Sequence, residues 1–316
     1  MGIDRITERQ VIGTFYQALK QNTGAEWING VSNYFTSDQA SEEYAWLGHS
    51  PVMREWVGGR NAKGFTENNL TIKNKHFEST LEVLVKDLRR DKTGQVMARI
   101  QELARRTNSH WASLLSTLII NGAATECYDG QYFFDTDHEE GDSGAQSNDI
   151  EVDISGLPVA TAGTTTAPSI AEFQFAIAKG IQQIVGFVDN QGEPMNSDAS
   201  RFMVMVPTVF MNTAYQAVAT PAQVAETQSA LQAMKSQFGI DVVVNPRLTW
   251  TEAFALFRTD SFIKSFIRQE EKGVELKVKG YGSEYEFDND AHQYGVDTWR
   301  NVGYGYWQNS CLVTLT

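Results

Sequence analysis

The chain has 316 residues, 41% of them hydrophobic and 21% charged, so it can bury a substantial core and is not a disordered polypeptide. Its 26 basic and 39 acidic side chains give a net charge of −13, which argues against a reader of nucleic-acid sequence, because phosphate contacts need clustered Lys and Arg. Two cysteines, Cys127 and Cys311, are too few for a disulfide framework, and no apolar stretch is long enough to cross a bilayer. We therefore expect a soluble protein with no membrane partner, of two domains or one large elaborated domain.

The first 80 residues combine one short helix with long segments of weak periodicity. Residues 6–20 are predicted to form a helix whose apolar stripe is Ile12, Phe15, Tyr16 and Leu19. Residues 21–50 are rich in aromatic and polar side chains, which is typical of an arm that lies against something else. Residues 51–80 form an extended excursion with a glycine-rich tip at 58–64. Because a long two-stranded loop is only marginally stable alone, we expect it to pair with a neighbour.

The longest predicted helix follows and ends near Asn121-Gly122, a typical stop signal. Its apolar stripe is predicted to be Val96, Ile100, Leu103, Thr107, Trp111, Leu114 and Leu118. The opposite face carries Arg99, Gln101, Arg105 and Arg106. We interpret it as a large core helix, because the stripe is too short for a coiled coil.

The second half of the chain begins after a low-complexity loop at 139–168. Its predicted elements are a helix at 169–185 with a Ser169–Glu172 capping box, a strand at 201–206, a helix from Pro207, a helix at 221–238 and a buried strand at 240–244. This alternation predicts a compact α/β unit over 169–285, inserted between two parts of another domain. The aromatic tail at 297–316 is expected to return to the first half.

The acidic segment 135–142 is the only cluster that suggests a metal site, and it fits no template. As a calcium loop it has Glu140 where glycine is needed and Gln146 where the last ligand should be glutamate. As a zinc-protease helix, His138 would need a second histidine where Asp142 stands. No phosphate-binding or nucleophile motif is present either. The sequence therefore predicts no catalytic residue, no cofactor and no bound metal.

Three motifs resemble a known family. They are EYAWLGHSPVMREWVGGR at 43–60, TIKNKHFE at 71–78 and YDGQYFFDTDH at 128–138, with a looser match, FIKSFIRQ, at 262–269. Together these segments resemble the major head (capsid) protein of Mu-like tailed bacteriophages and prophages. The likeness is dense over residues 40–140, whereas the composition of the loop at 139–168 matches no family pattern.

The resemblance implies an α+β chain with the Hong Kong 97-type (HK97-like) capsid fold. The family's parts then fall on an N-terminal arm at 1–47, an extended β-hairpin loop at 48–80, a peripheral domain at 81–168 with a spine helix at about 92–121, an inserted axial α/β domain at 169–285, and a C-terminal return to the peripheral domain at 286–316.

The function implied is assembly without catalysis. Copies of the chain would form the hexamers and pentamers of an icosahedral head, built in the bacterial host cytoplasm and present in the virion. Implied partners are neighbouring capsomers together with the scaffold, portal and decoration proteins of a phage head. The shell would enclose double-stranded DNA without sequence-specific binding, and the acidic composition agrees with such a role.

The inter-subunit contacts implied by the resemblance fall on the arm and the extended loop. The candidate residues are Trp46, Met53, Arg54, Trp56, Arg60 and Lys63. Buried tryptophans supply much of the binding energy of many interfaces. Trp46 and Trp56 could equally belong to the subunit's own core. The three basic side chains would contact acidic neighbours, or would simply be solvated.

Two other functions are weighed against this one. An encapsulin-like nanocompartment shell would share the fold but package enzymes, so electron microscopy of the particle contents distinguishes it. A metal-dependent hydrolase using 135–142 would form no particles at all.

Overall fold

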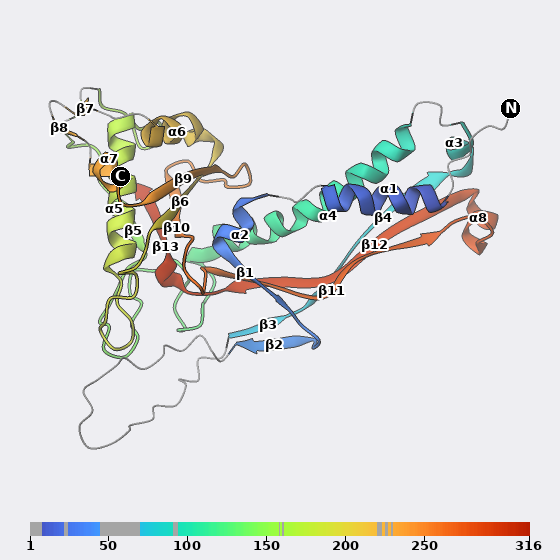
Figure 1. The fold of residues 1–316 in the computed structure, drawn as a ribbon, viewed down its shortest axis with the longest axis horizontal. Helices are drawn as coiled ribbons and strands as arrows, with labels where there is room; N and C mark the ends of the chain where they lie inside the picture. The colour runs from blue at the N-terminus through green and yellow to red at the C-terminus, as the bar shows by residue number, and fades with distance from the viewer. Residues whose placement is uncertain are drawn as a thin grey trace, which may run out of the picture.

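The computed structural model describes residues 8–21, 25–44, 70–90, 94–157, 159, 161–219, 223–224, 227–228 and 230–316. Within these ranges the chain is elongated, with one broad end and one long narrow end (Figure 1). A five-stranded sheet and its helices make the broad end, and a four-stranded sheet with a long helix forms the narrow end. The predicted α+β class is confirmed. Among the helices of this described part, none is both long and apolar enough to span a membrane.

The four-stranded sheet is built around one long hairpin. Its strands, in spatial order, are β1 (Ser32–Thr36), β11 (Phe266–Lys279), β12 (Ala291–Tyr304) and β4 (Lys75–Leu84). The β1–β11 pair is parallel and the other pairs are antiparallel. With 14 residues each, β11 and β12 extend about 45 Å at ~3.3 Å per residue. The short helix α8 (Glu284–Asn289) lies at the tip of their hairpin.

A separate two-stranded ribbon lies beside this sheet. It consists of β2 (Ser41–Tyr44) and β3 (Leu70–Lys73), which pair in antiparallel register with Tyr44 opposite Leu70. The ribbon therefore brings the two ends of segment 45–69 next to each other.

The predicted long helix is present as α4 (Gln95–Ile120), which spans about 40 Å at ~1.5 Å per residue. Its first half packs with α1 (Glu8–Gln21) and β12 in a small core of its own. Its second half joins the main core, to which α2 (Trp27–Val31) also contributes. The helix α3 (Val85–Arg90) follows β4, and η2 (Asn121–Ala123) ends α4 near the predicted stop.

The predicted apolar stripes of both N-terminal helices need correction. In α4 the first four predicted residues are buried, but the second half buries Ala112, Leu115, Ser116 and Ile119, and Leu114 is only partly buried. The stripe shifts because the helix leaves one core and enters another that approaches it from a different direction. In α1 the fully buried residues are Val11 and Phe15, whereas Ile12 is half-buried.

The five-stranded sheet forms the broad end. Its strands, in spatial order, are β5 (Asp149–Val152), β13 (Ser310–Leu315), β10 (Ala253–Arg258), β6 (Arg201–Val206) and β9 (Gly239–Val244). The β5–β13 and β6–β9 pairs are parallel and the two central pairs are antiparallel. Every residue of β10, the central strand, is buried, as expected where both faces of a sheet are covered.

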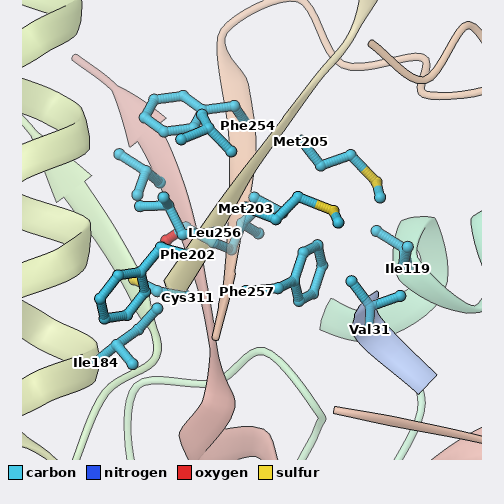
Figure 2. Packing of buried hydrophobic residues seen from close by; sticks show 14 of the residues in the cluster. Val31, Ile119, Ile184, Phe202, Met203, Met205, Phe254, Leu256, Phe257 and Cys311 are labelled. Carbon is cyan, nitrogen blue, oxygen red and sulfur yellow. The ribbon is translucent and has the colours of Figure 1, made fainter. Parts of the chain in front are cut away.

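Helices cover both faces of this sheet (Figure 2). Along β6, Phe202 faces α5 (Ile170–Gly186) and Met203 faces the opposite side, where Val31 of α2 and Ile119 of α4 lie. The predicted capping box opens α5, since Ser169 Oγ accepts from the Glu172 backbone N–H and the Glu172 carboxylate accepts from the Ser169 N–H. A Cβ at Gly180 would overlap Leu256 of β10, so glycine at this position allows the close packing of α5 on the sheet.

Several predicted elements of the second half take another form. The helix predicted at 221–238 is replaced by β7 (Gln223–Val224), β8 (Thr227–Gln228) and α7 (Ala230–Met234). The helix predicted from Pro207 is present as η3 (Thr208–Phe210) followed by α6 (Met211–Ala219). The strand at 240–244 is found as β9, but it is an edge strand in which only Ile240 is buried. Part of the predicted loop at 139–168 forms β5.

Sheet membership also differs from the division expected from the sequence. The final strand β13, preceded by η4 (Trp307–Asn309), pairs with β10 and β5 in the five-stranded sheet. Strand β11, which begins at Phe266, pairs with β12 in the four-stranded sheet instead of the five-stranded one. The chain therefore crosses between the two sheets more often than a simple insertion would require.

Candidate functional site: assembly surfaces and a buried polar cluster

The six residues predicted for inter-subunit contact, Trp46, Met53, Arg54, Trp56, Arg60 and Lys63, all lie outside the described residues. What the structure does describe is the attachment of their segment. Gln269 of β11 is fully buried and holds the β2–β3 ribbon from both strands. Its Oε1 accepts from the Tyr44 hydroxyl at 2.8 Å, and its Nε2 donates to the Ile72 carbonyl at 3.2 Å and to Asn74 Oδ1 at 2.8 Å. The segment 45–69 thus leaves from a firmly held ribbon.

Three large aromatic side chains are almost fully exposed on the subunit. Phe287 of α8 is 91% exposed and Tyr281, just before α8, is 84% exposed. Phe262, between β10 and β11, is 91% exposed. Large aromatic side chains left exposed to water are unfavourable, and aromatic residues are enriched on surfaces that another chain covers.

The tip that bears Tyr281 and Phe287 is ordered by local hydrogen bonds. The Ser283 hydroxyl caps α8 by accepting from the Glu286 N–H at 3.2 Å. The Glu286 carboxylate accepts from the Gly282 N–H at 2.6 Å and lies 3.1 Å from His292 Nε2 of β12. Tyr281 and Phe287 therefore lie on an ordered turn and helix at the far end of the hairpin.

A second feature is a cavity between α4 and the four-stranded sheet, with a volume of about 160 Å³. The guanidinium of Arg300, which is 2% exposed, borders it and donates to the Thr107 carbonyl at 3.0 Å and to His110 Nδ1 at 3.1 Å. The same guanidinium lies 4.7 Å above the Trp111 ring. Arg300 of β12 therefore joins the sheet to Thr107, His110 and Trp111 of α4.

Burial beside the cavity shifts the pKa values of Arg300 and His110. Burial lowers the pKa of Arg300 to about 10. Burial, and next the charge of Arg300, lower the pKa of His110 to about 4. Glu78 and Arg106 also line the cavity. His110 is therefore neutral at pH 7, and its Nδ1 is free to accept the hydrogen bond from Arg300.

This depressed pKa predicts that acid destabilises the subunit through His110. As pH falls below about 6.5 the unfolded chain takes up the proton first, so stability is lost between about pH 6.5 and pH 4. Because His110 is partly exposed, we expect a loss of about 1–2 kcal/mol, less than the full shift would give. Urea unfolding at pH 7 and pH 4.5 measures it. The variant His110→Gln keeps an acceptor for Arg300 and should lose less; an equal loss in both proteins would contradict the assignment.

The third feature is a buried polar cluster in the segment that follows α4. His138 is completely buried, and its ring stacks on Trp307 with a centroid distance of 3.9 Å and an interplanar angle of 8°. Its Nδ1 lies 2.7 Å from Asp129 Oδ2, and its Nε2 lies 3.2 Å from Asn148 Oδ1. The Cys127 thiol donates to Asp129 Oδ1 at 2.9 Å. His138 is thus not part of the acidic surface turn that its sequence neighbours suggest.

Burial and hydrogen bonding set the charge states in this cluster. Burial opposes the charged form of Asp129, but hydrogen bonds from His138 and Cys127 outweigh it and lower the pKa of the carboxyl. Burial, and next the charge of Asp129, raise the pKa of the Cys127 thiol well above its usual value. The other cysteine, Cys311, is also buried and unbonded to sulfur. Sequence reasoning missed this cluster because nothing in the spacing joins Cys127 and Asp129 to His138.

Comparison with known proteins places the chain in a family. The family described as the Mu-like prophage major head subunit gpT matches residues 7–158 and 227–314. The Mu-like prophage FluMu major head subunit of Haemophilus influenzae is 36% identical over 111 residues, which are 35% of this chain and 36% of that protein. The major capsid protein of Escherichia phage Mu is 33% identical over 138 residues, 41% of this chain and 45% of that protein. The matched part spans less than half the length of either relative.

Solved structures show the fold. The procapsid of bacteriophage JBD30 matches with a TM-score of 0.55 at 24% identity, covering 98% of this chain and 76% of that one. The JBD30 capsid decorated with minor capsid protein trimers matches with a TM-score of 0.52 at 19% identity, covering 92% and 65%. A virus-like particle from Pyrococcus furiosus matches with a TM-score of 0.50 at 8% identity, covering 97% and 98%. The predicted capsid-type fold is confirmed.

The family match covers both ends of the chain and includes the motifs at 71–78 and 128–138. It favours a phage head subunit over a nanocompartment shell, and a structural protein over a hydrolase. The chain belongs to the family of Mu-like prophage major head subunits.

Proposed function

We propose that this chain is the major capsid protein of a Mu-like phage or prophage and assembles into the hexamers and pentamers of an icosahedral head in the virion. The observation that supports this most strongly is the family match over 7–158 and 227–314, combined with a capsid-type fold over nearly the whole chain. The proposal extends to the enclosed double-stranded DNA and to assembly in the bacterial host cytoplasm. Electron microscopy of the purified, overexpressed chain tests it, because closed shells are expected and an isolated monomer would contradict it.

The proposed peripheral and axial domains correspond to the two sheets. The four-stranded sheet with α4 would form the peripheral domain, and the five-stranded sheet with α5 and α6 would form the axial domain at the capsomer centre. Residues 1–47 would act as an arm and residues 48–80 as the extended loop. Strands β5 and β13 would belong to the axial unit, which moves the boundaries expected from the sequence.

The extended loop is proposed to reach a neighbouring subunit, with Trp46, Met53 and Trp56 as anchors and Arg54, Arg60 and Lys63 as polar contacts. The support comes from the base of the loop. Tyr44 and Leu70 pair opposite each other, and Gln269 holds both strands of the ribbon to the sheet. A loop held at its base can transmit force between subunits without loosening its own domain, and modest contacts repeated by symmetry add up to a stable shell.

Scaffold, portal and decoration proteins are proposed as further partners. The decorated JBD30 capsid carries trimers of a minor capsid protein on a related fold. The exposed aromatic residues Phe262, Tyr281 and Phe287 are available for contacts either with neighbouring subunits or with such proteins.

The free subunit is predicted to bind duplex DNA negligibly at physiological salt. The net charge is −13. On the exposed basic face of α4, the charge of Arg106 is partly neutralised by Glu102 of the same helix, because Arg106 Nη2 lies 2.7 Å from Glu102 Oε1. Non-specific binders typically reach only about 10⁻⁴–10⁻⁶ M even with basic surfaces. A gel-shift titration in about 150 mM salt measures it. Micromolar binding with a steep salt dependence, lost on replacing Arg99 and Arg105 by Gln, would instead reveal a concentrated basic surface.

A further inference from the structure

Three different metal-binding side chains converge in the buried polar cluster. The donor atoms of Cys127, Asp129 and His138 all lie within 4.8 Å of one another. Thiolate sulfur, imidazole nitrogen and carboxylate oxygen are together the ligand types that zinc prefers. The acidic segment 135–142, tested alone, lacks this combination, because Cys127 and Asp129 precede it in the sequence.

The surroundings of His138 fix which of its ring nitrogens carries hydrogen. Asn148 Nδ2 donates to the Phe133 carbonyl at 2.7 Å, and Asn148 Oδ1 accepts from the Asp135 N–H at 2.9 Å. The side-chain oxygen of Asn148 therefore faces His138 Nε2, which must be protonated to donate to it at 3.2 Å. His138 Nδ1 is then the ring nitrogen that faces Asp129, and in the metal-free cluster a proton lies between Nδ1 and Asp129 Oδ2, which are 2.7 Å apart.

This is the arrangement found around metal-bound histidines, whose second nitrogen donates to an oxygen of the protein and fixes the ring. The Trp307 ring stacks on one face of the His138 ring and also fixes its orientation.

The Cys127 thiol also supports a metal site. A thiol is a weak hydrogen-bond donor, so Cys127 adds little to a purely hydrogen-bonded network, whereas a thiolate is a strong zinc ligand.

We propose that Cys127, Asp129 and His138 form a structural zinc site, in which the hydrogen-bonded cluster is the protonated form. On binding, Zn²⁺ takes the thiolate sulfur, a carboxylate oxygen and His138 Nδ1 as ligands. The thiol proton and the proton shared between Asp129 and His138 leave to solvent. A water molecule completes the four ligands that zinc requires.

The position of the site gives it a structural role. Its ligands tie together the turn that follows α4, and through Asn148 and Trp307 they reach the start of β5 and the η4 segment before β13. A metal here would stiffen the junction between α4 and the five-stranded sheet. The inference does not rest on the capsid function, because it concerns one folded subunit.

Cobalt titration of the whole chain tests the proposal. The purified protein is stripped with a chelator and titrated with Co²⁺, whose thiolate bond gives a charge-transfer absorption. We expect one equivalent to bind, Zn²⁺ to displace it, two protons at most to be released per ion, and Zn²⁺ to raise the melting temperature. Elemental analysis should find one zinc per chain.

Two cysteine variants provide the matched comparison. Cys127→Ser should abolish the thiolate–cobalt absorption and weaken zinc binding more than about 100-fold, since changes in the outer shell alone cost about 10–100-fold. Cys311→Ser, which alters the other buried cysteine, in β13, should keep both the absorption and the zinc affinity. Circular dichroism checks that each variant is folded. Absence of binding to the wild-type chain, or a cobalt–thiolate band that survives Cys127→Ser, would show that the cluster is a hydrogen-bonded network only.

Discussion

Deleting residues 59–64 should leave a folded subunit that makes no closed shells. The deleted residues include the glycine-rich tip of the proposed extended loop and lie well inside the segment whose ends the β2–β3 ribbon joins. The hydrogen bonds of Gln269 to Tyr44, Ile72 and Asn74 remain, so the subunit's own stability should change by less than about 1 kcal/mol. Shell assembly multiplies each contact by symmetry, so loss of one contact per subunit is expected to be decisive.

Negative-stain electron microscopy and size-exclusion chromatography measure the outcome, and circular dichroism with urea unfolding checks the fold. In a second variant, a Gly/Ser segment of equal length replaces residues 59–64. This variant distinguishes the effect of loop length from the effect of the side chains. If that variant assembles and the deletion does not, the length of the loop matters and Arg60 and Lys63 do not. Normal particles from the deletion variant would contradict the intermolecular role of this loop.

The sequence predicted best where local signals and tertiary packing agree. Helix α5 begins at its capping box because Ser169 and Glu172 satisfy each other's backbone groups, wherever the helix packs. Strand β6 occupies the predicted range because its apolar run is buried on both faces. The same local reasoning failed at 221–238, where the described residues form β7, β8 and the short α7, in which Leu231 is buried.

Other features could not be read from the sequence because they depend on distant segments. The stripe of α4 changes direction where its partner changes from α1 to the main core, and Arg300, which holds His110 and Trp111, is remote along the chain. In the polar cluster, Asp129 links His138 to Cys127 by hydrogen bonds, and His138 stacks on Trp307, which is distant in the sequence. The six interface residues came from the family resemblance, and they stay predictions.

The corrected register of α4 leads to the other prediction of large effect. Leu115→Asp should abolish soluble expression of the subunit. Leu115 is fully buried in the main core, so the substitution places an unpaired carboxylate among apolar side chains. This costs several kcal/mol in addition to the lost packing, a large part of the ~5–15 kcal/mol that stabilises a typical domain.

Its neighbour provides the control. Leu114 is only partly buried, so Leu114→Asp can turn its carboxylate to solvent and should stay soluble in the isolated subunit, with a cost of about 1 kcal/mol. Comparing the soluble and insoluble fractions of the two variants after identical expression decides between the registers. The stripe predicted from the sequence would give the reverse result, an insoluble Leu114→Asp and a soluble Leu115→Asp. That outcome would mean that the second half of α4 turns a different face to the five-stranded sheet, and that the contact of Ile119 with this core is wrong as well.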